Sequence, residues 1–208
     1  MAYKENYPSA LLQEAVEAIG SLPGVGRRSA LRLALHLLKQ PAENVHHFTG
    51  AIDRLRDQVC YCSRCRMISD QEICSICADH SRNQDLICVV ESVRDVMSIE
   101  ATGQYHGVYH VLGGIISPIA GVGPSDLNIG DLTRRVHALP DPSKAEVILA
   151  LSGDVEGETT AFYIYRQIQD CGIKITTLAR GLGFGDDLEY ADSLTLGRSI
   201  LNRQIFKL

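Results

Sequence analysis

Four cysteines in the first half of the chain follow the pattern C-x2-C-x8-C-x2-C, at Cys62, Cys65, Cys74 and Cys77. Each C-x2-C pair lets a tight turn aim two thiolates at one point, and two pairs complete the closed tetrahedral shell of a structural Zn2+ site. The alternatives are two disulfides or four free thiols. The close spacing of the two cysteine pairs favours zinc over both. Cys60 and His80 lie near enough in sequence to compete as ligands, but we interpret both as bystanders. The pattern predicts a zinc finger over residues 59–80 with Zn2+ as its structural cofactor.

Length and composition describe an ordinary globular protein. The chain has 208 residues, of which 45% are hydrophobic, enough for one sizeable core and a smaller module. We find neither the apolar core of a signal peptide nor a run of 18 apolar residues, so we expect a cytoplasmic, nucleoid-associated protein with no membrane partner. A reducing compartment also favours metal over disulfides at the cysteine cluster.

The net charge of -5 is distributed unevenly along the chain. Residues 1–66 hold nine Lys or Arg and six Asp or Glu, whereas residues 67–208 hold eleven and nineteen. The first segment is therefore basic although the whole chain is acidic. This asymmetry predicts a basic end that contacts an anionic partner, and a body with a different task.

A short glycine-containing turn separates two predicted helices near the N-terminus. Leu22-Pro23-Gly24-Val25-Gly26 lies between amphipathic helices expected over 9–20 and 27–39, and a third helix is expected over 41–59. This is a helix-hairpin-helix signature, in which glycines permit the sharp turn and backbone amides point outward where a phosphate can accept them. Leu22 and Val25 are expected to plug the turn. The expected buried stripe of the second helix comprises Ala30, Leu31, Ala34, Leu35 and Leu38.

Basic side chains continue from this turn along the second helix. At 3.6 residues per turn, Arg28, Arg32 and Lys39 lie within about 40° of one another, on a different face from the apolar stripe. The alternative is a helical connector with a solvated charged face. Because the donors suit phosphate and none requires a base edge, we predict sequence-independent DNA binding. The expected DNA-binding residues are Gly24, Gly26, Arg27, Arg28, Arg32 and Lys39.

From residue 86 the pattern changes to short apolar runs separated by helices. Strands are expected over 86–90, 108–112, 147–151 and 173–178, and helices over 92–101, 131–139 and 156–171. Buried parallel strands have this composition, so the body is predicted to be α/β, with an open doubly wound sheet. Ligands of such sheets bind at the carboxyl ends of the strands.

Acidic residues stand at those ends. Glu91 follows the first strand, and Ser152-Gly153-Asp154-Val155-Glu156-Gly157 follows the third. This arrangement resembles the Toprim fold of primases, topoisomerases and related nucleases, whose working members hold Mg2+ with a glutamate and a D-x-D-x-x-G motif. Ser152 replaces the first aspartate, and a hydroxyl is a poor ligand for a hard divalent cation. Glu91, Asp154 and Glu156 either hold one Mg2+ weakly or serve as helix caps and partner contacts, and we favour the latter. Because we favour the cap interpretation, we expect no catalytic residues. No phosphate-binding G-x-x-x-x-G-K-[ST] motif occurs, so we do not expect ATP hydrolysis.

The order of these parts resembles one family, the RecR recombination mediators of bacteria, over nearly the whole chain. The most specific stretches are 22–26, 62–77, 87–92, 109–124, 155–158 and 188–192. The chain differs from many relatives at Gly183-Phe184 and Asp186, in a glycine-rich segment expected to contact a partner or a neighbouring subunit.

The resemblance implies a non-catalytic protein that assembles into a ring-like homotetramer, clamps DNA, and works with RecO and RecF to load recombinase on gapped or single-stranded DNA. It assigns DNA contacts to Arg28 and Arg32. The expected domains are 1–58 (helix-hairpin-helix), 59–80 (zinc finger), 85–181 (Toprim) and 182–208 (oligomerisation). In the last of these Leu196, Ile200, Leu201, Ile205 and Phe206 pack either on a neighbouring subunit or on the chain's own body. The rival interpretation is a Mg2+-dependent Toprim nuclease or primase.

Overall fold

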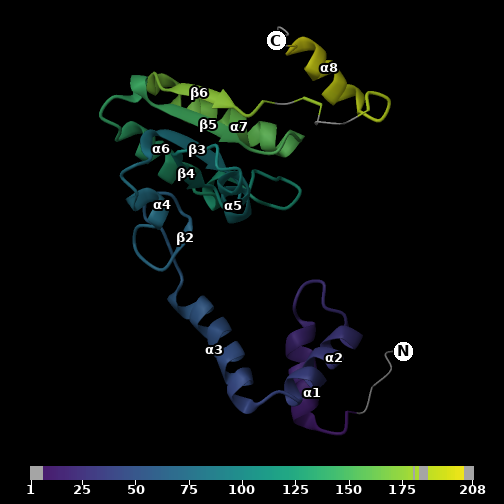
Figure 1. The fold of residues 1–208 in the computed structure, drawn as a ribbon. Coiled ribbons are helices and arrows are strands. Elements are labelled where there is room, and N and C mark those ends of the chain that lie inside the picture. The colour runs from purple at the N-terminus through teal and green to yellow at the C-terminus, as the bar shows by residue number, and fades with distance from the viewer. Residues whose placement is uncertain (1–6, 180, 183–186, 204–208) are drawn as a thin grey trace. The chain divides into compact units, whose positions relative to one another are not determined.

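The chain divides into two compact units in the computed structural model (Figure 1). The structure describes residues 7–179, 181–182 and 187–203. The first unit comprises residues 1–58 and the second residues 59–208. Among the positions discussed above, Gly183, Phe184, Asp186, Ile205 and Phe206 lie outside the described residues.

Three helices form the first unit: α1 (Ala10–Gly20), α2 (Arg27–Leu38) and α3 (Ala42–Gln58). All three were predicted from the sequence. The side chain of Ser9 caps α1 by accepting a hydrogen bond from the backbone N–H of Leu12. Val16 of α1 packs in one small core with Ala30 and Ala34 of α2, where the short alanine side chains let the helices approach closely.

The predicted buried stripe of α2 is only partly correct. Ala30 and Ala34 are buried and Leu31 is half-buried, but Leu35 is 39% exposed and Leu38 is 75% exposed. The helix that packs along α2 is α1, and it covers only the alanine side. Leu22, expected as a plug, is likewise exposed, whereas Val25 does pack against the small core.

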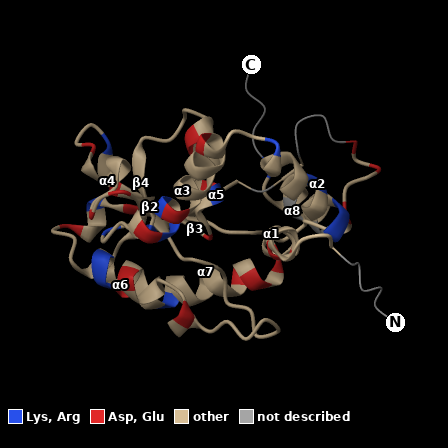
Figure 2. Cartoon of the chain, turned by 90° about the horizontal axis from the view of Figure 1, so that it is seen from below, with Lys and Arg blue, Asp and Glu red and all other residues tan. Residues whose placement is uncertain are grey.

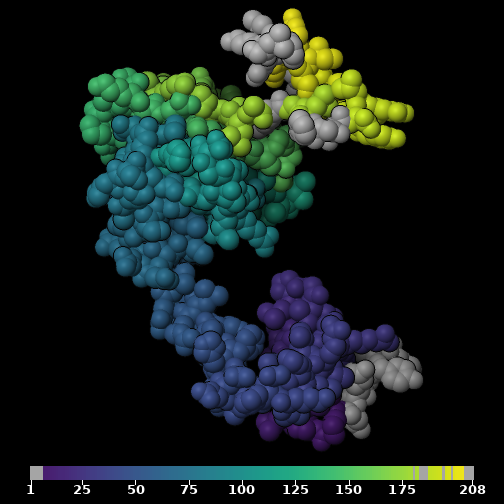
Figure 3. Space-filling model, viewed as in Figure 1, coloured from purple at the N-terminus to yellow at the C-terminus, as the bar shows by residue number. Residues whose placement is uncertain are grey.

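The second unit begins with the cysteine-rich finger. Strand β1 (Cys60–Tyr61) pairs antiparallel with β2 (Ile68–Ser69), and a short helix α4 (Ser75–Ala78) follows. Met67 and Ile76 pack against buried side chains of the body, and the N–H of Val111 donates to the carbonyl of Cys65 at 2.8 Å. The space-filling view shows the blue atoms of the finger continuous with the teal body (Figure 3). The finger is thus joined to the body by packing as well as by the chain.

A four-stranded parallel sheet forms the centre of the body, in the order β4-β3-β5-β6. Its strands are β3 (Asn83–Val90), β4 (Gly107–Val111), β5 (Glu146–Ala150) and β6 (Lys174–Thr177). In the central strand, Val89 pairs with His110 of β4 on one side and with Leu149 of β5 on the other.

Helices cover both faces of this sheet. Ile87 and Val89 of β3 point to a core shared with α6 (Ile129–His137) and α7 (Val155–Ile168). Cys88 and Val90 point to the opposite core, which α5 (Val93–Ala101) and the finger complete. The doubly wound α/β prediction is therefore confirmed. Short 3-10 turns at Pro124–Asp126, Pro142–Lys144 and Gln169–Cys171 connect elements, and α8 (Ser193–Leu201) is the last helix of the described chain.

Within the described ranges, no helix is both long and apolar enough to cross a bilayer.

Candidate metal centre and nucleic-acid interface

The four predicted zinc ligands converge in the finger. The sulfur atoms of Cys62, Cys65, Cys74 and Cys77 all lie within 4.8 Å of one another, and each residue is at most 4% exposed. All four are free thiols rather than disulfide partners. In the part of the chain that the structure describes, no other group of three or more His, Cys, Asp or Glu residues places its ligand atoms this close together. A closed set of four soft donors fits a structural Zn2+ and leaves no position for a substrate.

The backbone around the cysteines also favours metal binding. Arg66 adopts a left-handed conformation (φ 63°), which lets its N–H donate to the carbonyl of Cys62 at 2.9 Å. The N–H of Cys74 donates to the sulfur of Cys62 at 3.3 Å, which stabilises a thiolate. The thiol of Cys60 instead lies within hydrogen-bonding distance of two backbone carbonyls outside the cluster, those of Ser69 and Gln71, at 3.1 and 3.2 Å.

Protons are held unevenly by the four thiols. Burial raises the pKa of Cys74 to about 11. The hydrogen bond from Cys65 lowers the pKa of Cys77 to about 6, and the positive charge of Arg135 acts in the same direction. Four buried thiolates are unfavourable without a cation to compensate their charge, so metal binding and folding of the finger are coupled.

The predicted DNA-binding region comprises the turn between α1 and α2 and the basic residues that follow it on α2. We call this region, residues 22–39, the elbow. Gly24 takes a positive φ of 78°, where a side chain would be strained, and the N–H of Val25 closes the turn on the carbonyl of Leu22 at 3.1 Å. Gly26 is the N-cap of α2 and provides no side-chain cap. The first amides of α2 consequently lie at a helix N-terminus that can accept a phosphate.

The basic residues of the elbow differ in their surroundings. Arg28, Arg32 and Lys39 are exposed, and among the described residues no carboxylate forms an ion pair with any of them. The Nε of Arg27 donates to the hydroxyl of Tyr7 at 3.3 Å, and its guanidinium lies 5.9 Å from that ring's centroid. Arg27 is thus engaged locally, while the other three side chains face solvent.

The acidic residues meet at the carboxyl edge of the sheet, as predicted. Burial raises the pKa of Glu91, and the charges of Asp95, Asp154 and Glu156 raise it further. Asp154 is the N-cap of α7, and its carboxylate accepts hydrogen bonds from the N–H of Gly157 at 2.7 Å and the hydroxyl of Ser152 at 2.9 Å. The helix-cap interpretation is therefore correct for Asp154.

Two further acidic residues at this edge have structural partners. Glu156 accepts a hydrogen bond from the hydroxyl of Ser117 at 2.5 Å. Asp95, which sequence reasoning missed, forms a capping box with Ser92 at the start of α5. The S-x-x-D spacing was the available signal for it. Asp95, Asp154 and Glu156 thus each accept local hydrogen bonds at this edge.

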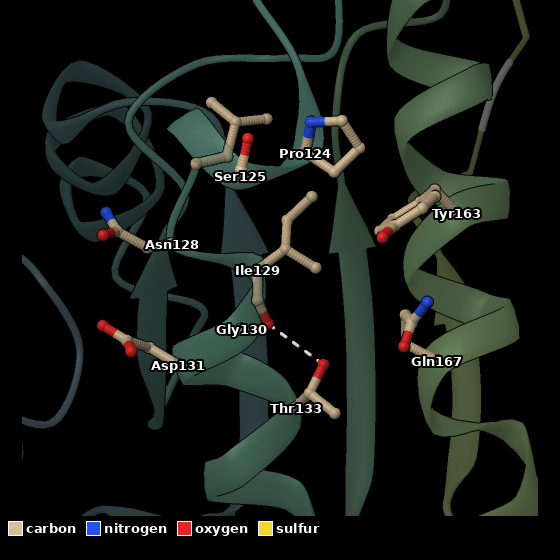
Figure 4. Close-up of a pocket in the computed structure, with 10 residues that line it drawn as sticks. Pro124, Ser125, Asn128, Ile129, Gly130, Asp131, Thr133, Tyr163 and Gln167 are labelled. Carbon is tan, nitrogen blue, oxygen red and sulfur yellow. Dashed lines mark hydrogen bonds between the residues drawn. The ribbon is translucent and has the colours of Figure 1, made fainter.

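A cavity of about 510 Å3 lies between the start of α6 and α7, lined by side chains that include Pro124, Tyr163 and Gln167 (Figure 4). The dashed line marks the hydroxyl of Thr133 donating to the carbonyl of Ile129 at 3.0 Å. The single carboxylate of its lining, Asp131, already forms ion pairs with two arginines. We assign no chemistry to this cavity.

A helix-hairpin-helix unit, a four-cysteine zinc finger and a Toprim-type sheet on one chain define a modular zinc-finger protein of the Toprim class. Family profiles agree with this division. The RecR helix-hairpin-helix profile matches residues 12–55, the RecR four-cysteine zinc finger domain residues 59–79, the Toprim domain residues 85–179 and the RecR C-terminal profile residues 181–204.

Whole-chain relatives narrow the class further. Proteins named Recombination protein RecR from Porphyromonas gingivalis and Bacteroides thetaiotaomicron are 53% and 54% identical to this chain over 202 residues. The alignments cover 97% of this chain and 96% and 97% of the relatives. A relative of the same name from Flavobacterium johnsoniae is 53% identical over 201 residues, covering 97% of this chain and 96% of the relative. The chain belongs to the RecR family.

Proposed function

We propose that this protein is a DNA-binding mediator of recombinational repair. It assembles into a ring-like tetramer, clamps DNA by its phosphate backbone, and acts with RecO and RecF to promote loading of recombinase on gapped or single-stranded DNA. It does so in the cytoplasm, at the nucleoid. The chain belongs to a family whose members are named recombination proteins, and this supports a role in recombination. The elbow supports binding to the phosphate backbone of DNA.

The observation that carries the proposal is the elbow between α1 and α2. Gly24 and Gly26 present backbone amides at a helix start, and Arg28, Arg32 and Lys39 add exposed positive charge along the same helix. These donors contact phosphate without distinguishing bases, so affinity is expected to be electrostatic and strongly dependent on salt.

Self-association is supported by apolar surface that each unit leaves uncovered. Helix α3 has no buried residue, and Phe48, Ile52 and Leu55, at i, i+4 and i+7, are 49%, 51% and 62% exposed. In α8, Ile200 and Leu201 are 59% and 78% exposed. We propose that second copies of this chain cover these faces. A ring would combine the weak DNA contacts of several elbows at high effective concentration. In solution the assembled particle should have four times the 22.8 kDa chain mass.

We further propose that the acidic edge performs no bond-breaking. Ser152 supplies a hydroxyl where metal-dependent Toprim enzymes have a carboxylate, and the carboxylates of Asp154 and Glu156 accept hydrogen bonds within the protein. A hard divalent cation prefers several anionic oxygens, and those of Asp154 and Glu156 already accept hydrogen bonds. The edge is better suited to contact a partner protein.

The test of the elbow is the salt dependence of DNA binding. Arg28→Ala/Arg32→Ala should bind DNA much more weakly, and the slope of log K against log salt should fall by about 2 per elbow engaged, since each phosphate contact contributes about 0.9. Arg54→Ala/Arg56→Ala is the matched control, because it removes two exposed arginines from α3 in the same unit. Equal slopes for the two double variants would refute the elbow as the DNA contact.

A further inference from the structure

A second basic site lies in the body, in a groove of about 830 Å3 between the zinc finger and α6. Arg64 and Arg66 of the finger and Arg134 and Arg135 of α6 line it, with Asp131 as the one carboxylate of its lining. Both blue and red bands appear on α6 in Figure 2. These four arginines come from two segments far apart in the sequence, so the fold and not the local sequence gathers them.

The arginines are not equally available to a ligand. Arg135 is half-buried, donates to the carbonyl of Tyr109 at 2.7 Å, and exerts its charge on the cysteine cluster, so it belongs to the metal centre. Arg66 and Arg134 share the carboxylate of Asp131. Arg64 is exposed, and no carboxylate among the described residues pairs with it.

Three guanidinium groups therefore face the groove against one carboxylate. This surplus stands out because the second unit as a whole, residues 59–208, is acidic, with thirteen Lys or Arg against nineteen Asp or Glu. Two arginines in the last turn of α6 would be explained by the helix dipole alone. That explanation does not account for Arg64 and Arg66, which the finger brings to the same groove.

We propose that this groove is a second phosphate-binding site for the nucleic-acid backbone, separate from the elbow. Planar guanidinium groups match phosphate oxygens in pairs, and Ser63 and Gln84 add neutral donors to the lining. The lining has no aromatic side chain, the usual anchor of a protein interface, which disfavours an acidic peptide as its occupant. The inference rests on the proposed function in that the chain must bind DNA. A polyanion already held by one element gains a second contact at high effective concentration.

The test uses the full-length, zinc-loaded chain and a gapped DNA. Arg64→Ala/Arg134→Ala removes two exposed charges, and Arg134 is 78% exposed, so the fold should survive. Affinity at low salt should fall several-fold, and the slope of log K against log salt should decrease by about 1 to 2. Lys144→Ala/Arg166→Ala, which removes two exposed charges elsewhere on the body, is the matched control and should leave the slope unchanged. Zinc content and thermal unfolding verify the fold of both variants.

The outcomes separate the groove from the elbow. If only Arg28→Ala/Arg32→Ala changes the slope, the groove is not a DNA contact and the inference fails while the proposed function stands. If only Arg64→Ala/Arg134→Ala changes it, the groove stands and the elbow fails. Intact DNA binding together with lost binding of poly-glutamate in Arg64→Ala/Arg134→Ala would assign the groove to an acidic protein segment and overturn the inference.

Discussion

The buried histidine of β4 should make the body sensitive to mild acid. His110 is fully buried, its Nε2 lies 2.9 Å from the carbonyl oxygen of Asn128, and its Nδ1 has no hydrogen-bond partner among the described residues. Burial lowers the pKa of His110 to about 4, and the positive charges of Arg135 and Arg66 act in the same direction, against the carbonyl of Asn128 and the carboxylate of Asp131. The ring is therefore neutral in the folded protein at neutral pH.

The sign and size of the effect follow from linkage between protonation and folding. The unfolded chain takes up a proton on this histidine near its ordinary pKa of 6.5, whereas the folded protein does so only near 4. Stability is therefore lost as the pH falls through this interval. Between pH 7.5 and 5.5 the free energy of unfolding should decrease by about 1.3 kcal/mol from this group alone. With an m-value of about 2 kcal/mol per M, the urea midpoint should fall by about 0.7 M.

The assay is urea unfolding at fixed protein concentration across that pH range. His110→Gln removes the titrating group, so the variant should lose about this much of the wild-type pH dependence, whatever its absolute stability. His80→Gln is the control, since His80 is an exposed histidine of the same unit and its replacement should change neither the pH slope nor the zinc content. A His110→Gln variant whose stability falls with acid as steeply as the wild type would refute the reasoning.

Three further predictions concern the metal, the packing and the acidic edge. Cys74→Ser should abolish stoichiometric zinc in the purified protein and unfold the finger, because structural sites of this kind supply on the order of 10 kcal/mol of binding free energy; metal analysis and protease sensitivity measure both. Gly157→Ala should lower the melting temperature, since a Cβ there would overlap the hydroxyl and carbonyl oxygens of Ser152. At Gly130 a Cβ would meet no described atom within 4 Å, so Gly130→Ala should instead stabilise α6 by about 0.5 to 1 kcal/mol. Glu91→Gln should stabilise the protein at neutral pH, because the raised pKa of Glu91 means that its ionised form is disfavoured on folding. Unchanged or lower stability would contradict this. Metal-dependent DNA cleavage by the wild type that the variant loses would contradict the non-catalytic proposal.

The regular elements and the zinc ligands were predictable because local signals fix them. Ser9 and Ser92 mark helix starts by their cap positions, and the apolar runs beginning near residue 86 have the length and composition of buried parallel strands. The cysteine spacing specifies a metal site because the same backbone segment supplies both the ligands and the turns that aim them. Each of these inferences needs only residues near one another in sequence.

The features that sequence reasoning missed depend on contacts between distant segments. The exposure of Leu35 and Leu38 depends on how much of α2 is covered by α1, which helical periodicity cannot reveal. The arginine groove joins residues 64–66 to 134–135, and no spacing rule connects them. The alternation of side chains along β4 places His110 on the face of the sheet toward α6. Whether its Nδ1 finds a hydrogen-bond partner depends on the exact neighbours, which the sequence does not specify.

Arg66 is one of the residues that connect the metal centre structurally with the proposed groove. Arg66 owes its left-handed backbone to the turn that aims Cys62 and Cys65, and its side chain reaches Asp131 of α6. The ion pair therefore fixes the finger against the helix that supplies Arg134. A finger that lost its metal would release this turn, and with it the alignment of the arginines on both sides of the groove. Zinc should thus influence phosphate binding through position, although it contacts no ligand. That is the role a closed four-cysteine shell allows, since such a shell offers a substrate no coordination site and can act only by holding the surrounding backbone in place.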